Sequence, residues 1–173
     1  MDAGALFQKQ KPKLYIGYDH YADGPYFEGF RRLYGSLYEL TRDNSLAREI
    51  DGDDAEDFLR QARNGAMEAC AAAVILCGTR THLDKFVDWE IKAALDRKLS
   101  LIGLILPTNP GEAEGRPWLP QRLQANFEGG FAVICRWREL ADTQVDFGSR
   151  LRFAMAQPVD KIDNSLPLRS RNG

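Results

Sequence analysis

The sequence predicts an α/β fold with an open parallel sheet and helices on both faces. Two runs, AAAVILCG at 71–78 and LSLIGLIL at 99–106, are apolar almost throughout rather than at alternate positions. Strands that are covered on both faces have this pattern, which is typical of parallel sheets. Residues 86–95 lie between the two runs and carry apolar residues at helical spacing. Strands that alternate with helices in this way favour parallel crossover units.

The first half of the chain supplies the outer elements. Residues 13–18, KLYIGY, are rich in aromatic and β-branched residues and predict a strand. Residues 26–40 carry apolar residues at helical spacing and predict a helix, and residues 46–51 predict a short edge strand. A further helix is predicted over 55–70, because the acidic residues that precede it suit a helix N-terminus.

The second half completes the sheet. Residues 131–137, FAVICRW, predict a fifth strand, and residues 146–156 predict a last helix. The segment 107–130 is rich in Pro and Gly and predicts a long loop, and loops of that length are often functional or mobile.

Length and charge restrict the classes of function. A chain of 173 residues predicts a single domain, which we place at 13–156. A flexible lead is expected at 1–12, and the polar tail at 157–173 is expected to be disordered. The net charge of −2, with acids and bases interspersed, gives no electrostatic case for binding nucleic acid or an anionic membrane.

The cysteines and apolar runs indicate a compartment. Cys70, Cys77 and Cys135 are irregularly spaced, which argues against a disulfide framework and against a metal site. The first residues lack the apolar core of a signal peptide. The longest apolar runs are about eight residues, far short of the roughly 20 that span a bilayer. A cytoplasmic location is therefore expected.

Polar residues follow two of the predicted strands at the edge where ligands bind in open α/β sheets. Tyr18, Asp19 and His20 follow the first strand, and Gly78 and Thr79 follow the middle one. Neither turn has the G-x-G-x-x-G pattern of a dinucleotide fold, and no P-loop is present. The middle strand also lacks the terminal Asp of a phosphorylated receiver. Hydride transfer, ATP hydrolysis and receiver phosphorylation therefore lose support.

Glu90 is the candidate acid. Val87, Ile91 and Leu95 define the buried stripe of its helix, and Glu90 lies about 75° from the centre of that stripe at roughly 100° per residue. We therefore expect it on the flank, partly buried and close to the strand-end edge, where it is a candidate for chemistry. The alternative is that the acid only stabilises the helix dipole.

Residues 71–107 resemble the core of TIR-like domains, and most closely the ThsB-type TIR-like proteins of the Thoeris antiphage system. The run Phe86-Val87-Asp88-Trp89-Glu90 stands where TIR domains usually have Trp-Cys-x-x-Glu. The first strand and its loop resemble the TIR start, although the usual Ser is Gly17 here. The resemblance covers residues 13–106, and it implies a TIR-type, flavodoxin-like sheet.

The resemblance also implies an activity. TIR enzymes cleave NAD⁺ at the nicotinamide–ribose bond, and Thoeris-type proteins release a cyclic or modified ADP-ribose signal that activates a separate effector. Glu90 would then be the catalytic carboxylate, NAD⁺ the substrate, and no cofactor or metal would be needed. Self-association and a phage-derived activator are expected partners.

The remaining candidate residues each have a structural alternative. The expected substrate-binding residues are Tyr18, Asp19, His20, Gly78, Thr79, His82 and Trp89. Asp19 can instead hold its own turn, and His82 can be a solvated loop residue. The helical count points Trp89 away from the buried stripe, so it can instead cover a neighbouring loop or a subunit contact.

Two other functions remain open on the sequence. A non-catalytic assembly module would be favoured if Tyr21, Tyr26, Trp89 and Trp118 formed an exposed patch. A nucleoside N-glycosidase on the same fold is the second alternative.

Overall fold

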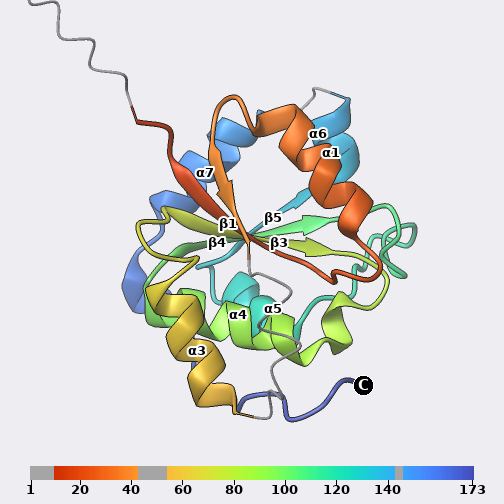
Figure 1. Ribbon diagram of the computed structural model, residues 1–173. Helices are drawn as coiled ribbons and strands as arrows, with labels where there is room; N and C mark the ends of the chain where they lie inside the picture. Colours follow the sequence, from red (N-terminus) through yellow and green to blue (C-terminus); the bar gives the residue numbers. More distant parts are fainter. Residues whose placement is uncertain (1–9, 43–53, 143–145) are drawn as a thin grey trace, which may run out of the picture.

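The computed structural model describes residues 10–42, 54–142 and 146–173 and contains a parallel sheet with the strand order β2-β1-β3-β4-β5. The strands are β1 (Lys13–Gly17), β2 (Glu39–Thr41), β3 (Ala72–Cys77), β4 (Ser100–Ile105) and β5 (Val133–Arg136). Helices lie on both faces of this sheet (Figure 1), so the predicted α/β fold is confirmed.

Two hydrophobic cores lie on the two faces of the sheet (Figure 1). One face is covered by α3 (Ala55–Asn64), α4 (Lys85–Asp96) and α5 (Gln121–Glu128). The other is covered by α1 (Gly24–Tyr34), α6 (Trp137–Ala141) and α7 (Phe147–Met155). Every residue of β3 is buried, which is the double covering that its continuous apolar run predicts.

Side-chain caps fix where two helices begin. The carboxylate of Asp54 accepts hydrogen bonds from the backbone N–H groups of Glu56 and Asp57, and α3 starts there as the acidic run predicts. The carboxylate of Asp84 accepts from the N–H groups of Phe86 and Val87 and starts α4. The predicted extension of α3 to residue 70 is wrong, because the helix ends at Asn64 and Gly65 follows.

The helix predicted over 26–40 is also too long. Helix α1 ends at Tyr34, and residues 39–41 instead form the edge strand β2, which pairs with β1. Sheet pairing therefore overrides the helical spacing of the last apolar residues. The edge strand predicted at 46–51 and most of the lead at 1–12 lie outside the described residues.

The segment 107–130 is not one long loop. Pro120 precedes α5, and the residues before it are held by a buried Asn109. The Asn109 amide donates to the carbonyls of Cys77 and Trp118, while its oxygen accepts from the N–H groups of Gly111 and Trp118. The bonds to Trp118 fold the loop into a closed turn against the end of β3.

The C-terminal residues are ordered, against expectation. After the short helix η2 (Val159–Lys161), residues 162–173 run along α4 and α5 and end beside η1 (Thr81–Leu83). We call residues 162–173 the C-terminal strap. Ile162 and Leu168 pack against the core on that face, so the strap is part of the folded domain.

The described residues include no helix long and apolar enough to cross a membrane. Within the same residues, no group of three or more His, Cys, Asp or Glu side chains could hold a metal ion. All three cysteines are buried thiols.

Candidate functional site

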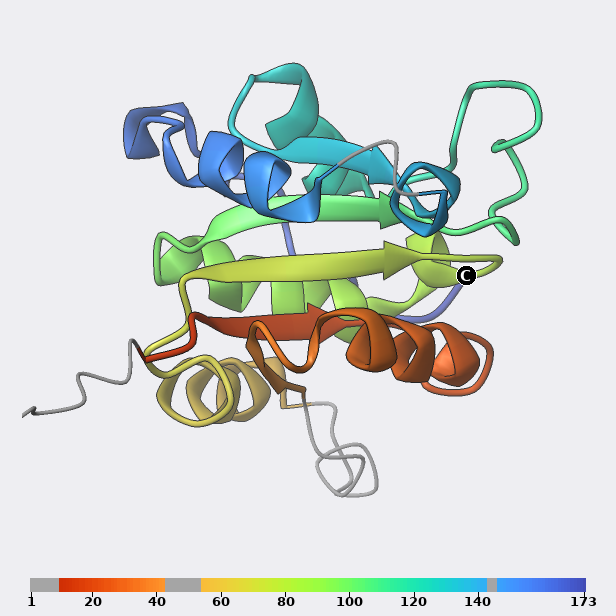
Figure 2. The same cartoon turned by 90° about the horizontal axis from the view of Figure 1, so that it is seen from above.

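The carboxyl ends of the strands form one edge of the molecule, and Figure 2 shows the arrowheads of β3, β4 and β5 pointing to it. A cavity of about 310 Å³ opens at this edge, and we call it the strand-end cavity. It is lined by Asp19, Tyr21, Arg80, Leu83, Asp84, Phe86 and Asn172. The loop after β1, the η1 segment, the first turn of α4 and the end of the strap therefore meet there.

Glu90 lies beneath this cavity rather than in it. Its side chain is one helical turn beyond Phe86, a residue of the cavity wall, and therefore on the same side of α4. Only 1% of Glu90 is exposed, so the predicted flank position is wrong. The narrow stripe underestimated burial because the Glu90 carboxylate lies against Gly17 at the end of β1, while the strap covers Asp88 and Trp89, so every residue from Val87 to Ile91 is buried.

Gly17 makes room for the Glu90 carboxylate. A Cβ atom built on Gly17 would lie 2.9 Å from Glu90 Oε2 and 2.8 Å from Ile75 Cδ1, both closer than van der Waals contact. The absence of a side chain at the end of β1 therefore lets the carboxylate approach the backbone.

Gly17→Ala is expected to displace the Glu90 carboxylate and to lower the stability of the fold by about 1–3 kcal/mol, the usual cost of overpacking. Urea unfolding measures the stability change. The Gly24→Ala variant is a control for the added methyl group, since a Cβ there would meet nothing within 4 Å. Equal stability of the Gly17→Ala variant and the wild type would contradict this packing.

Residues after β1 form an aromatic stack. The Tyr18 ring lies between His20 and Phe27, with centroid distances of 4.3 and 5.0 Å. Arg42 donates to the Tyr18 hydroxyl, and its guanidinium lies 4.5 Å from the Phe27 ring centre. Tyr18 is 1% exposed, so in this state it supports the loop rather than presenting a surface for a ligand.

Asp19 both holds its own turn and lines the strand-end cavity. Its carboxylate accepts hydrogen bonds from the N–H groups of Tyr21 (2.9 Å) and Ala22 (3.4 Å), which is the turn-holding alternative. The same residue lines the strand-end cavity. Asp19 is therefore the predicted binding residue that lies directly on the cavity wall.

The other predicted binding residues are spread over the edge and beyond it. The Gly78 N–H donates to Thr81 Oγ1 at 2.8 Å, and the exposed Thr79 hydroxyl donates to the Thr108 carbonyl. His82 lines a different cavity of about 370 Å³ and packs edge-on against Trp118, 5.0 Å between ring centres. Burial, together with the positive charge of Arg169, lowers the pKa of His82.

Trp89 faces inward instead of outward. It is 3% exposed, packs against Phe58 and Phe86, and donates its indole N–H to the Arg169 carbonyl at 2.8 Å. The expectation that Trp89 points away from the buried side is therefore wrong. Its place against the strap agrees with the structural alternative, in which it covers a neighbouring segment.

Asp23 is a buried acid that the sequence reasoning missed. Asp23 is the N-cap residue directly before α1 and is 1% exposed, and its carboxylate accepts a hydrogen bond from Thr81 Oγ1 at 3.3 Å. A Cβ on Gly78 would overlap this carboxylate, so Gly78 permits the close approach of the two loops. Burial, and then the negative charge of Asp19, raises the Asp23 pKa to about 6, although the Thr81 hydrogen bond opposes this.

Asp23→Asn should change how stability depends on pH. In the wild type the native carboxylate has a pKa of about 6, raised from the ordinary aspartate value of 3.8. Between these values the native state binds more protons than the unfolded chain, so this group's contribution to stability falls as pH rises and levels off above the native pKa. The stability of the variant relative to wild type should therefore increase by about 2–3 kcal/mol from acidic to neutral pH.

Urea unfolding of both proteins across that pH range measures the difference directly. The Thr81→Val variant serves as a second check, since it removes the hydroxyl that stabilises the ionised form. A pH-independent difference between Asp23→Asn and the wild type would contradict the raised pKa.

The open parallel sheet, with an acid-bearing helix beneath a strand-end cavity, defines a flavodoxin-like α/β domain of the TIR-like class. Residues 15–110 match the family model described as Thoeris protein ThsB, TIR-like domain. Because the match spans more than half of the 173 residues, the chain belongs to this family. No curated protein matches the chain closely enough to count as a relative.

Proposed function

We propose that this TIR-like domain cleaves NAD⁺ at the nicotinamide–ribose bond, with Glu90 as the catalytic carboxylate. The observation that carries the proposal is the position of Glu90, one helical turn below the wall of the strand-end cavity in a chain of the ThsB family. The cavity volume of about 310 Å³ is at the lower end of the range for small-molecule sites.

A single carboxylate is sufficient for this bond cleavage. Nicotinamide in NAD⁺ carries a positive charge, so it leaves as a neutral molecule without being protonated. The ribose carbon then becomes cationic, as in glycoside hydrolysis. An ionised Glu90 would stabilise that charge more strongly in the transition state than in the bound substrate, which is the condition for acceleration.

Other groups of the cavity wall suit the rest of the substrate. Arg80 supplies a positive charge for the diphosphate, and Asp19 can accept hydrogen bonds from ribose hydroxyls. If water attacks the ribose carbon, the product is ADP-ribose, and if a hydroxyl of the same molecule attacks it, the product is cyclic. We propose that such a product activates a separate effector, and that self-association or a phage-derived component controls the enzyme.

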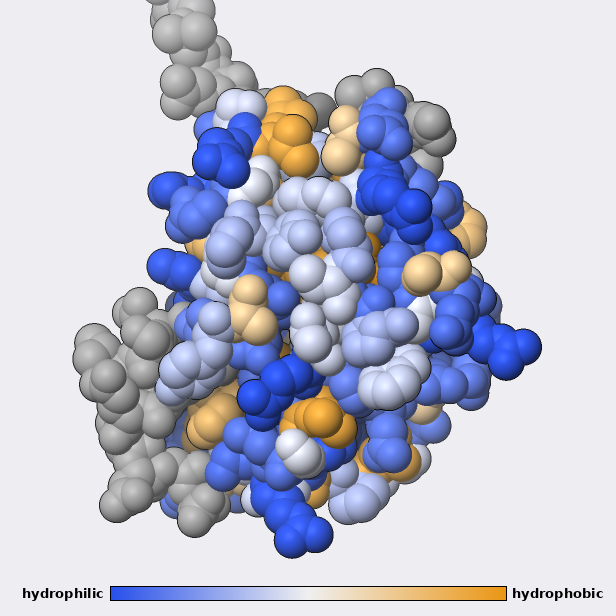
Figure 3. All heavy atoms as spheres, turned by 90° about the vertical axis from the view of Figure 1, so that its right-hand side faces the viewer, coloured by the Kyte–Doolittle hydropathy of each residue, from blue (hydrophilic) through white to orange (hydrophobic). Residues whose placement is uncertain are grey.

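An assembly module is the second candidate, because Tyr21 is 99% exposed and Trp118 is 53% exposed on loops at the strand-end edge. Figure 3 looks onto this edge and shows a mostly hydrophilic surface with scattered apolar residues. Trp89, which would have belonged to the same patch, is buried. The burial of Trp89 therefore removes one of the four aromatic residues that such a patch would contain.

The test is incubation of the purified protein with NAD⁺ and, separately, with a panel of nucleosides, followed by mass spectrometry of the products. Release of nicotinamide together with an ADP-ribose species supports the proposal. Base release from nucleosides with intact NAD⁺ would replace it by the N-glycosidase. The same measurement in cells with and without phage infection includes any activator, and unchanged NAD⁺ there would favour the assembly module.

A further inference from the structure

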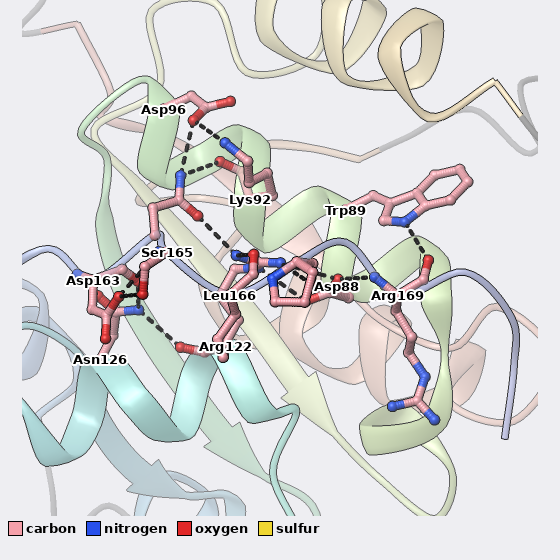
Figure 4. Close-up of polar contacts among 12 residues, drawn as sticks. Asp88, Trp89, Lys92, Asp96, Arg122, Asn126, Asp163, Ser165, Leu166 and Arg169 are labelled. Atoms are coloured by element: carbon pink, nitrogen blue, oxygen red, sulfur yellow. Dashed lines mark hydrogen bonds and ion pairs between the residues drawn. The ribbon is translucent and has the colours of Figure 1, made fainter.

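The C-terminal strap is fastened to α5 through a fully buried arginine (Figure 4). The Arg122 guanidinium donates to the carbonyls of Leu166 (2.9 Å) and Pro167 (3.1 Å) and to the side-chain oxygen of Asn164 (3.1 Å). It also forms an ion pair with Asp88 of α4 at 2.9 Å. One side chain thus joins α4, α5 and the strap.

Two further contacts tie the strap to the residues that directly precede Glu90. The carboxylate of Asp88 accepts a hydrogen bond from the Arg169 N–H at 2.9 Å. The indole of Trp89 donates to the Arg169 carbonyl, and Figure 4 shows it turned toward that residue. The position of the strap and the position of the first turns of α4 are therefore coupled.

The last residues of the strap reach the strand-end cavity. The Leu83 carbonyl accepts from Arg169 Nε (3.1 Å) and from the Gly173 N–H (3.2 Å). The Asn172 side chain accepts from the Lys85 N–H at 2.8 Å and forms part of the cavity wall. Figure 2 shows the C-terminus at the same edge as the arrowheads of the strands.

The strap also separates two cavities. Asn172 lines the strand-end cavity, while residues 166–171 line the cavity of about 370 Å³ that contains His82. Asp84 lines both. Movement of the last residues of the strap would therefore join the two cavities around Asp84 into one longer site.

We propose that residues 170–173 close the site, and that their release from η1 and α4 gives a dinucleotide access to Glu90. This inference rests on the proposed function. A carboxylate that is 1% exposed does not touch a substrate, so part of its surroundings must move before it reacts. Among the described residues around the cavity, the strap end is weakly held, because it belongs to no strand of the sheet and is bonded to α4 and η1 through Asn172 and Gly173.

The geometry favours this movement over two others. The loop after β1 is fixed by the Asp19 turn and by Asp23, and the loop after β4 is fixed by Asn109. By contrast, residues 170–173 are exposed, and the bonds from Asn172 and Gly173 to the protein involve one side-chain oxygen and one backbone N–H. The anchors at Arg122 and Trp89 can remain in place while this end opens.

The test measures how fast a water-soluble carbodiimide with an amine modifies the Glu90 carboxyl, read by peptide mass spectrometry. Deletion of residues 170–173 should accelerate labelling by at least about tenfold, since it removes the closed state. Asn172→Ala in the full-length chain should accelerate it to a smaller extent, and it decides the matter if the deletion variant does not fold. Gln157→Ala, which alters a half-buried side chain outside the strap, is the matched control and should label like the wild type.

The same variants are then assayed for binding of NAD⁺ and for its consumption. Faster labelling together with tighter NAD⁺ binding supports the inference. Unchanged labelling of Glu90 in folded variants overturns it, whatever the activity. Faster labelling without NAD⁺ binding or cleavage would overturn the access of a dinucleotide and the proposed function together, while the strap would still be shown to cover Glu90.

Discussion

Replacing Arg122 by methionine should lower the free energy of unfolding by about 3–5 kcal/mol, the usual cost of removing one partner of a buried ion pair. The Arg122 side chain is 0% exposed and that of its partner Asp88 only 12%. Without the guanidinium, the Asp88 charge keeps only the Arg169 N–H as a described partner, and the carbonyls of Leu166 and Pro167 lose a donor. The loss therefore combines a poorly compensated charge with unsatisfied backbone groups.

A double-mutant cycle with Asp88→Leu separates these two effects in urea unfolding. The Arg122→Met/Asp88→Leu protein should be more stable than the sum of the single changes predicts, because no uncompensated charge is left. Arg60→Met is the control, since that arginine forms an exposed ion pair with Asp57 and its loss should cost no more than about 1 kcal/mol. Additive effects of the Arg122 and Asp88 changes would refute the coupling.

The centre of the fold could be predicted from the sequence because its signals are local. The apolar runs at 71–78 and 99–106 predict strands that are covered on both faces, and they correspond to β3 and β4. The helix between them follows from the spacing of Val87, Ile91 and Leu95. Patterns within one element were sufficient here, because the strands are covered by helices on both faces and the stripe of α4 packs on the sheet.

Burial produced by distant segments could not be predicted in the same way. The strap meets Trp89 and Asp88 across about eighty residues of sequence, and no local pattern on α4 records that contact. A weak signal was present in the strap, where Ile162, Leu166 and Leu168 are half-buried and lie four and two residues apart. The many polar residues between them favoured the prediction of a disordered tail.

The candidate site shows the same difference between residues with a local sequence signal and residues placed by distant segments. Glu90 and Asp19 were selected from their order along the chain, and the structure places one below the strand-end cavity and the other in its wall. The sequence did not indicate Arg80, Asn172 or Asp23, because a loop or the strap brings each of them to the site. Asp23 looked like an ordinary turn residue before Gly24 and Pro25.

The largest effect on activity is expected for Glu90→Gln, which should lower the rate of NAD⁺ cleavage by about 10²–10³-fold or more. Glutamine has nearly the same shape and fits the space beside Gly17, but it carries no negative charge to stabilise a cationic ribose. Because that charge develops mainly in the transition state, kcat should fall far more than the affinity for NAD⁺.

Glu139→Gln is the matched control, because Glu139 is a partly buried glutamate that accepts a hydrogen bond from the Arg136 N–H at the start of α6, on the opposite face of the sheet. This variant should consume NAD⁺ at the wild-type rate under the same activating conditions. Urea unfolding of both variants shows whether the fold is kept. If Glu90→Gln is folded and still consumes NAD⁺ within about threefold of the wild-type rate, a difference below 1 kcal/mol in the barrier, the carboxylate is not catalytic. The chemistry would then have to be assigned to another acid of the edge, of which Asp19 is the one that lines the cavity and Asp23 the one with the raised pKa.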